Sequence, residues 1–345
     1  MIKKFWTGLG LALILTVTGC GNTEKQPINV DPITVEADLV LRIGVSTNRE
    51  DDRSKAAQFF ADEILKKTGG RVGAQLFPDG QLGADDELIR SLAENTGTVD
   101  IIITDASNFT KYEPKMGISA LPFQFQDFDQ AWAFMDSSIE ATVEKSLLDH
   151  NMRVLAHYCN GFRCMTNNVR PVTVPLDLAG LNIRTPDNPV IIATMKAIGA
   201  KPKTLGFNKV YDALKRGEFD GQENPIPVIY NNKLYEVQKY LSVTNHIYSG
   251  MCFTISEEVW KKLTTEQQQI LQEAALASAE MDRRMNREQT ENLVDALEEK
   301  GMEVNYPDLE SFQQVTIPVL TDNLQTYGDL IDRLSDWKKL YNSGE

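Results

Sequence analysis

The first folded part of the chain alternates between strand-like and helix-like patterns. Apolar residues occupy every second position of 39–45, which predicts a strand. A helical face with Ala57, Phe60, Ala61 and Ile64 follows and ends at two glycines. Further elements are predicted over 72–77 (strand), 85–94 (helix) and 99–104 (strand). This alternation predicts an α/β lobe with a largely parallel sheet.

A second alternation of strands and helices begins near residue 154. Its predicted elements are strands over 154–158 and 181–184 and helices over 190–198 and 209–216, each helix followed by a glycine. The folded part of the chain has about 305 residues, more than one hydrophobic core usually organises. We therefore expect two lobes.

A long helix is predicted from Thr265 to Lys300, because this segment contains neither proline nor glycine. Thr265 and Gln268 fit a capping box at its start. Apolar stripes mark both ends while 282–292 is mostly polar, so the helix is expected to pack on both lobes and to cross open ground between them. Two helices with an unmarked break are the alternative.

The N-terminal segment has the architecture of an export signal over residues 1–19. Lys3 and Lys4 precede an apolar stretch over 9–17, which is shorter than the roughly 20 residues of a membrane-spanning helix. The run 17–20 resembles the lipobox of bacterial lipoproteins, in which Cys20 becomes the lipidated first residue. Residues 20–38 then form a polar, flexible tether. An ordinary secretory signal that contains a cysteine is the alternative.

The charge of the chain argues against nucleic acid as a partner. The sequence has 49 acidic and 35 basic residues, and removal of Lys3 and Lys4 with the signal leaves 33 basic ones, a charge near −16. Beyond Cys20 there are three cysteines, Cys159, Cys164 and Cys252, so at most one disulfide is possible, and buried structural thiols are the expectation. The three histidines form no tightly spaced set with the cysteines, so no metal site and no cofactor are predicted.

Signatures of several enzyme classes are missing from the sequence. It has no phosphate-binding glycine loop that ends in Lys-Ser/Thr, no nucleophile elbow and no His-Glu-x-x-His helix. We therefore expect a protein that is not an enzyme. Two arginines in apolar, glycine-bounded settings, Arg163 and Arg184, offer instead the planar donor fork that matches a carboxylate. By spacing alone, a surface or interlobe salt bridge is the favoured interpretation of either arginine.

The chain resembles the DctP-type solute receptors of TRAP (tripartite ATP-independent periplasmic) transporters. The matching motifs are FP and QLG at 77–83, ALPF at 120–123, NGFR at 160–163, GLNIRTP at 180–186, VYDAL at 210–214, FDGQENP at 219–225 and YEVQKY at 235–240. The resemblance covers nearly all of the chain after residue 38. It implies the class II type of two-lobed, periplasmic-binding-protein-like α/β fold, with a ligand cleft between the lobes and a long helix that bridges them. Lobe I is expected at 39–160 plus 250–289, and lobe II at 161–249 plus 290–345.

The resemblance also implies a site for one small organic acid. Arg184 looks like the arginine that holds the ligand carboxylate in a two-pronged salt bridge, and Arg163 like the second arginine of that clamp. Asn224 looks like the amide that also bonds the carboxylate, and Phe207 like the aromatic residue against the ligand's apolar face. In lobe I, four positions are expected to face the cleft and to set selectivity: Ser46, Asp85, Asp105 and Asn108.

The ligand and its destination are also implied by the resemblance. Asp85, which is also predicted to cap a helix, and Asp105 would accept bonds from ligand hydroxyls and repel a second carboxylate. The run 187–189 is similar to receptors for sugar acids such as uronates. We therefore expect an extracytoplasmic, lipid-anchored receptor that delivers a sugar acid to the small and large membrane subunits of a permease. A C4-dicarboxylate receptor, a sensory receptor for a membrane kinase and an extracellular carbohydrate hydrolase are the alternatives. The exact ligand, the oligomeric state and the type of cell envelope stay open.

Overall fold

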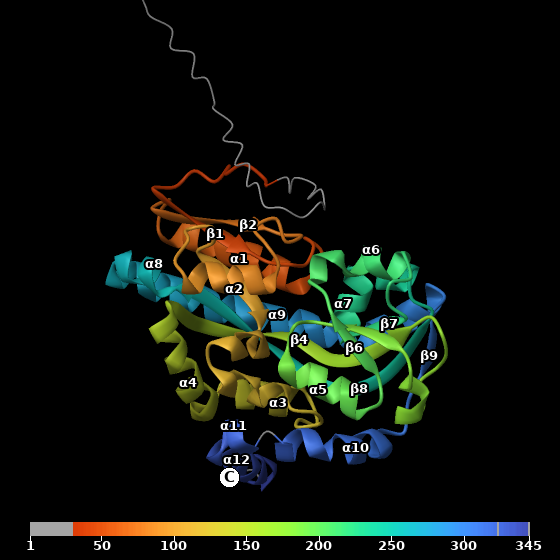
Figure 1. Cartoon of the computed structure of the whole chain (residues 1–345). Coiled ribbons are helices and arrows are strands. Elements are labelled where there is room, and N and C mark those ends of the chain that lie inside the picture. The colour runs from red at the N-terminus through yellow and green to blue at the C-terminus, as the bar shows by residue number, and fades with distance from the viewer. Residues whose placement is uncertain (1–29, 323, 344–345) are drawn as a thin grey trace, which may run out of the picture.

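The structure of the chain, a computed structural model, describes residues 30–322 and 324–343 (Figure 1). Within these residues the strands form one nine-stranded sheet in the order β2-β1-β3-β8-β4-β7-β5-β6, with β9 beside β8. The strands are β1 Leu39–Gly44, β2 Val72–Phe77, β3 Ile101–Asp105, β4 Met152–Asn167, β5 Asn182–Thr185, β6 Lys201–Thr204, β7 Gly221–Pro225, β8 Tyr240–Ser256 and β9 Glu303–Asn305.

Two long antiparallel strands, β4 and β8, form the centre of this sheet. They have 16 and 17 residues and run through both halves of the molecule. On one side β3 pairs with β8, and on the other β7 pairs with β4, both antiparallel. The predicted parallel pairing is confirmed only further out, where β1 pairs with β2 and β3, and β5 with β6 and β7. The expectation of a largely parallel sheet is wrong for the centre, because the pattern at 154–158 revealed only a third of β4.

The helices are α1 Asp52–Lys67, α2 Asp85–Ala93, α3 Phe128–Met135, α4 Ser138–Glu144, α5 Pro189–Ala197, α6 Val210–Lys215, α7 Ile226–Asn231, α8 Glu257–Lys262, α9 Thr265–Glu299, α10 Leu309–Asp322, α11 Leu324–Tyr327 and α12 Asp329–Ser343. Short 3₁₀ helices are η1 Ala106–Lys111, η2 Pro114–Ala120, η3 Lys145–His150, η4 Pro175–Leu178, η5 Phe207–Lys209 and η6 Leu234–Glu236. The predicted apolar face of α1 is buried.

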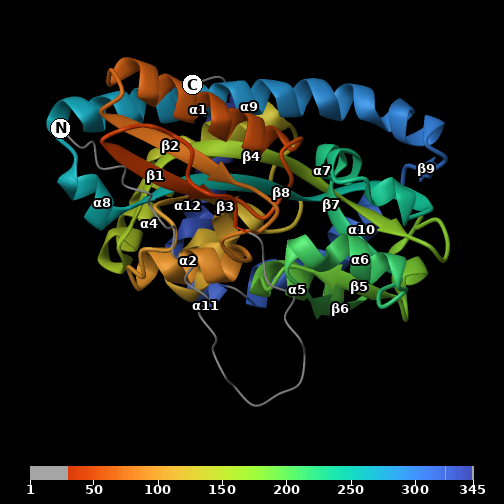
Figure 2. The same cartoon turned by 90° about the horizontal axis from the view of Figure 1, so that it is seen from above.

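Both faces of the sheet are buried, which explains the continuous apolar run in β3. Ile101 and Ile103 belong to a core under α1 and α9, while Ile102 belongs to a core on the opposite face, under α2 to α5. Figure 2 shows α1 and α9 side by side along one side of the sheet. The C-terminal helices cover the other face: α10 contacts α5, and α12 contacts α4. These helices touch elements of both expected lobes, and the lobe boundaries remain a proposal.

The long helix is confirmed as a single helix, α9, of 35 residues. Its capping box lies one residue earlier than predicted, at Thr264 with Gln267. Its polar middle does not cross open ground: Asp282 accepts a hydrogen bond from the backbone N of Cys159 at 2.6 Å, and Asn286 donates to the carbonyl of Asn160 at 3.1 Å. Both are buried, so the polar residues satisfy the backbone of β4 where its register with β8 shifts.

β4 requires a glycine at the point where its register with β8 shifts. Gly161 has a φ of +110°, and a Cβ atom there would lie 3.0 Å from Pro225 and 3.1 Å from Asn286. The segment that carries Arg163 is therefore packed against β7 and α9. No helix in the described part of the chain is long and apolar enough to cross a membrane.

Candidate ligand-binding site

A cavity of about 400 Å³ lies between α2 and η1 on one side and β5, β6 and η5 on the other. A smaller polar pocket of about 40 Å³ shares five lining residues with it and extends to β4 and β7. All eight residues predicted from the sequence line one or both of them: Ser46, Asp85, Asp105, Asn108, Arg163, Arg184, Phe207 and Asn224. The structure thus brings together residues separated by up to 178 positions, and their contact with a ligand stays a prediction.

Arg184, in β5, is a buried cation without a carboxylate partner. Only 2% of its surface is exposed. Its Nε donates to the carbonyl of Leu205 at 2.8 Å, and its Nη2 donates to the same carbonyl. Its Nη1 donates to no described residue, and no described carboxylate lies within 4.0 Å of the guanidinium. Burial lowers the pKa of Arg184 to about 10, so the group is charged at neutral pH. The ring of Phe207 lies 5.8 Å from the guanidinium carbon.

Arg163, in β4, is buried to a similar extent but fully paired. Its Nε and Nη2 donate to the two carboxylate oxygens of Glu223, the latter at 2.8 Å. Nη2 also reaches Asn224 Oδ1 at 3.3 Å, and Nη1 reaches Ser249 Oγ at 3.4 Å. Burial alone would raise the pKa of Glu223, but the charges of Arg163 and His246 outweigh it and lower that pKa. Arg163 therefore makes its two-pronged salt bridge within the protein.

Asp85 faces the cavity from the first turn of α2. The prediction that it caps this helix is wrong, because the helix begins at Asp85 itself and Ala84 is in the cap position. Its Oδ2 instead accepts from Ser46 Oγ at 3.1 Å, and its buried Oδ1 has no hydrogen-bond partner. Burial raises the pKa of Asp85, while the charge of Arg53 opposes the shift. One carboxylate oxygen is thus left for a further donor.

Asp105 and Asn108 lie on the same side of the cavity as Asp85. They differ in how many of their hydrogen-bonding atoms already have a partner within the protein. Asp105 accepts from the backbone N of Ser107 at 2.9 Å and from the hydroxyls of Ser107 and Ser249. Asn108 donates to Thr104 Oγ1 at 2.9 Å and retains its carbonyl oxygen. Asp105 therefore organises its neighbours, and Asn108 presents a free acceptor.

The charged residues that line the two pockets include several that were not predicted from the sequence, among them Arg53 and Lys111. Arg53, 6% exposed, lines the smaller pocket and is held by Asp51 at 3.1 Å and by Asn160 Oδ1 at 2.7 Å. Lys111 forms an ion pair of 2.9 Å with Asp187 across the larger cavity. Arg53 follows two aspartates in the sequence, a charge pattern typical of a solvated helix face, so no local signal distinguishes it.

Asn188 has a structural role. It caps α5 by accepting from the backbone N of Val190 and of Ile191, and its side-chain amide donates to Ser107 in η1. This contact joins the two sides of the cavity. In the run 187–189, one residue thus caps a helix and another forms an ion pair at the cavity.

Two α/β halves that share long strands and enclose a polar cavity with an unpaired arginine define a solute-binding protein. The family model of DctP, the bacterial extracellular solute-binding proteins of family 7, matches residues 43–326. The chain belongs to this family, whose members include the periplasmic receptors of TRAP transporters.

Relatives of this chain are binding proteins. The 2,3-diketo-L-gulonate-binding periplasmic protein YiaO of Escherichia coli is 35% identical over 76% of this chain and 80% of its own length. The C4-dicarboxylate-binding protein DctB of Bacillus subtilis is 31% identical over 83% of this chain and 82% of its own. A TRAP solute-binding protein from Polaromonas sp. JS666, solved with D-erythronate, superimposes with a TM-score of 0.83 at 33% identity, over 86% of this chain and 97% of that one.

Proposed function

We propose that this chain captures a polyhydroxy monocarboxylate, such as a uronate or another sugar acid, and delivers it to a TRAP permease. The observation that carries the proposal is Arg184, a buried guanidinium whose remaining donors face a cavity and meet no carboxylate of the described residues. A buried charge is costly unless it is paired, and a ligand carboxylate would supply the pair in bidentate geometry. The cavity volume of about 400 Å³ lies within the usual range of roughly 300–1,000 Å³ for small-molecule sites.

The side of the cavity opposite Arg184 favours hydroxyls over a second carboxylate. Asp85 offers a partnerless acceptor there, and Asn108 offers a carbonyl oxygen. Ionised Asp85 would repel a second ligand carboxylate, whereas a hydroxyl donates to it. Relatives include binders of a diketo sugar acid, of D-erythronate and of C4-dicarboxylates, so Asp85 is the local feature that favours the sugar acid.

Closure around the ligand is the proposed signal to the permease. Lys111 with Asp187, and Ser107 with Asn188, join the two sides of the cavity. A ligand that contacts both sides would favour this closed arrangement by its differential contacts, and a permease would distinguish it from an open receptor.

Calorimetric titration tests the choice of ligand. The purified chain is titrated with D-glucuronate, D-galactonate, succinate and malate, and native mass spectrometry is used to look for a co-purified acid. We expect stoichiometric binding of a sugar acid and no product formation. Tighter binding of succinate or malate would favour the dicarboxylate receptor, and turnover of a sugar-acid conjugate would favour the hydrolase. Neighbouring genes for two membrane subunits would favour transport, and a neighbouring kinase gene would favour sensing.

We also infer that Cys20, which lies outside the described residues, carries the lipid anchor. The lipobox-like run 17–20 and the polar segment after it support this. The predicted tether is shorter than expected, because Asp31 and Thr34 are hydrogen-bonded to Gln81 and Gln75 at 3.0 and 2.7 Å. The remaining tether of about 10 residues would span roughly 16–19 Å and would raise the receptor's local concentration at the membrane. Metabolic labelling with palmitate should mark the protein but not a Cys20→Ser variant. Equal labelling of both would contradict the anchor.

A further inference from the structure

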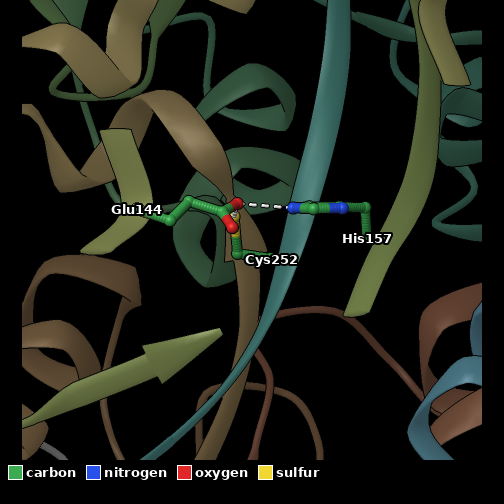
Figure 3. Close-up of side chains that lie close together, drawn as sticks. All are labelled: Glu144, His157 and Cys252. Atoms are coloured by element: carbon green, nitrogen blue, oxygen red, sulfur yellow. Dashed lines mark hydrogen bonds and ion pairs between the residues drawn. The ribbon is translucent and has the colours of Figure 1, made fainter. Parts of the chain in front are cut away.

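A group of metal-ligating side chains lies between α4 and the two central strands, away from the cavity (Figure 3). It consists of Glu144 at the end of α4, His157 in β4 and Cys252 in β8, and their ligand atoms all lie within 4.8 Å of one another. His157 and Cys252 are direct cross-strand partners, so the sheet fixes their separation. Glu144 contacts His157 Nε2, and its Oε1 accepts from the sulfur of Cys252 at 3.9 Å.

A second carboxylate, Glu140, lies one turn earlier on the same face of α4. It is 0% exposed, and neither of its carboxylate oxygens has a hydrogen-bond partner among the residues that the structure describes. Its electrostatic effect raises the pKa of His157 and that of Cys252, so Glu140 lies near the group of ligand atoms. A buried carboxylate with two unsatisfied oxygens is unusual in a folded protein and indicates a missing partner.

The Nδ1 atom of His157 contacts a carboxylate, an arrangement that is common for histidines in metal sites. Nδ1 lies 3.2 Å from Asp136 Oδ1, and Arg283 fixes Asp136 through two contacts of 2.6 and 2.8 Å. A carboxylate on one ring nitrogen orients the imidazole and raises the basicity of the other, which is the usual support behind a metal-bound histidine. Nε2 therefore points at Glu144 with its orientation set.

We propose that Glu144, His157 and Cys252 bind one Zn²⁺ ion or a similar transition-metal ion, and that the nearby Glu140 adds negative charge to the site. One sulfur, one imidazole nitrogen and carboxylate oxygens match the tetrahedral preference of zinc, whereas calcium and magnesium prefer oxygen ligands alone. Binding replaces the proton between His157 and Glu144 and deprotonates the Cys252 thiol, so protons are released.

The site would connect α4 to the strands that both halves of the molecule share, and so would stabilise the fold. Cys252 is 0% exposed, which leaves it inaccessible to an external substrate as a nucleophile. Spacing along the chain did not reveal this group, because its donors come from three elements up to 108 positions apart. Among the described residues, Cys159, Cys164 and Cys252 are all free and buried, so Cys164 offers a matched control thiol.

The test uses the full chain after dialysis against a chelator, titrated with zinc chloride and with cobalt chloride. We expect one zinc per chain, a thiolate-to-cobalt charge-transfer absorption, and a rise in Tm of about 3–6 °C at zinc concentrations 100 times Kd. Cys252→Ser should abolish the cobalt–sulfur absorption and weaken zinc binding at least tenfold, and Cys164→Ser should change neither. Asp136→Asn should weaken zinc binding about 10-fold to 100-fold, because it removes the support of His157.

Three results would overturn the site: no zinc binding by the native chain, cobalt binding without sulfur absorption, or equal zinc affinity in Cys252→Ser. If Cys252→Ser does not fold, the cobalt spectrum of the native chain together with Asp136→Asn decides the question. Sugar-acid affinity should not depend on zinc, so failure of this site leaves the proposed function intact.

Discussion

Arg163 and Arg184 lie at one pocket and are equally buried, yet their surroundings differ. Arg163 donates to both carboxylate oxygens of Glu223, while the only hydrogen-bond acceptor of Arg184 among the described residues is the carbonyl of Leu205. The free-energy cost of burying the Arg163 charge is offset by its ion pair with Glu223. The cost of burying the Arg184 charge is offset only in part, by hydrogen bonds to a carbonyl. We therefore propose an asymmetric clamp, in which Arg184 binds the ligand carboxylate and Arg163 holds Glu223 and Asn224 in place.

The difference teaches that residue type and burial do not assign a role to a buried arginine. The partner does. Both arginines occur in motifs of the family, and the sequence predicts one shared role for them. Glu223, one position before Asn224 in the motif at 219–225, is the residue that separates them.

Glu223→Gln should have the largest effect of the changes considered, and it acts on stability. It leaves the Arg163 guanidinium buried without a counter-charge, which we expect to lower the free energy of unfolding by about 3–5 kcal/mol. Urea unfolding followed by circular dichroism measures this loss. Glu218→Gln is the control, since Glu218 pairs with Arg216 at 2.7 Å on the surface and should contribute about 0–1 kcal/mol. Equal losses in both variants would contradict the structural role of Arg163.

The same pair predicts how stability depends on acid pH. The pKa of Glu223 is lower in the folded chain than the roughly 4.3 of a free glutamate, so its contribution is complete above that pH and is lost as pH falls through the folded value. Unfolding measured between pH 6 and 3 should therefore show a shallower loss of stability for Glu223→Gln than for the native chain. Parallel curves would show that Glu223 titrates normally.

Arg184→Ala should act on affinity. Loss of a charge-assisted bidentate contact should weaken sugar-acid binding by about 2–4 kcal/mol, roughly 30-fold to 1,000-fold. Arg184→Lys should recover only part of this, because lysine keeps the charge but not the planar fork. Calorimetry measures both variants, with Arg216→Ala as a surface control. Unchanged affinity in a folded Arg184→Ala variant would remove Arg184 from the proposed site.

Much of the fold could be predicted from the sequence, because local periodicity determines most of its elements. The strand over 72–77 and the single long helix are confirmed. The antiparallel centre could not be predicted, since strands buried on both faces lose their alternation and β4 contains a register shift at Cys159. The motifs and the family resemblance predicted eight residues, all of which line one or both of the two pockets. They did not predict that Arg53 lines the smaller pocket or that Glu223 pairs with Arg163, because both depend on contacts between distant segments.

Asp85→Asn should sharpen the contrast between the two sides of the cavity. If the free Oδ1 accepts from a ligand hydroxyl, loss of this charged acceptor should weaken sugar-acid binding by about 1.5–3 kcal/mol. Succinate should be affected less, because a repulsive charge is also removed. Competition titrations measure the ratio of the two affinities, with the exposed Asp62→Asn as control. A ratio that does not change would exclude Asp85 from selectivity.

Phe207→Leu should have the smallest effect, and it separates a role at the ligand from ordinary packing. The ring lies 5.8 Å from the Arg184 guanidinium and also packs against the core that contains Val210 and Leu214. Loss of a desolvated cation–π contact should weaken sugar-acid binding by about 0.5–2 kcal/mol, and Phe207→Tyr, which keeps the ring, should retain most of the affinity. If Phe207 serves the core alone, the free energy of unfolding will fall while affinity stays constant. Calorimetry and urea unfolding of the same two variants distinguish these outcomes, because a residue that orients Arg184 changes affinity without a matching change in stability.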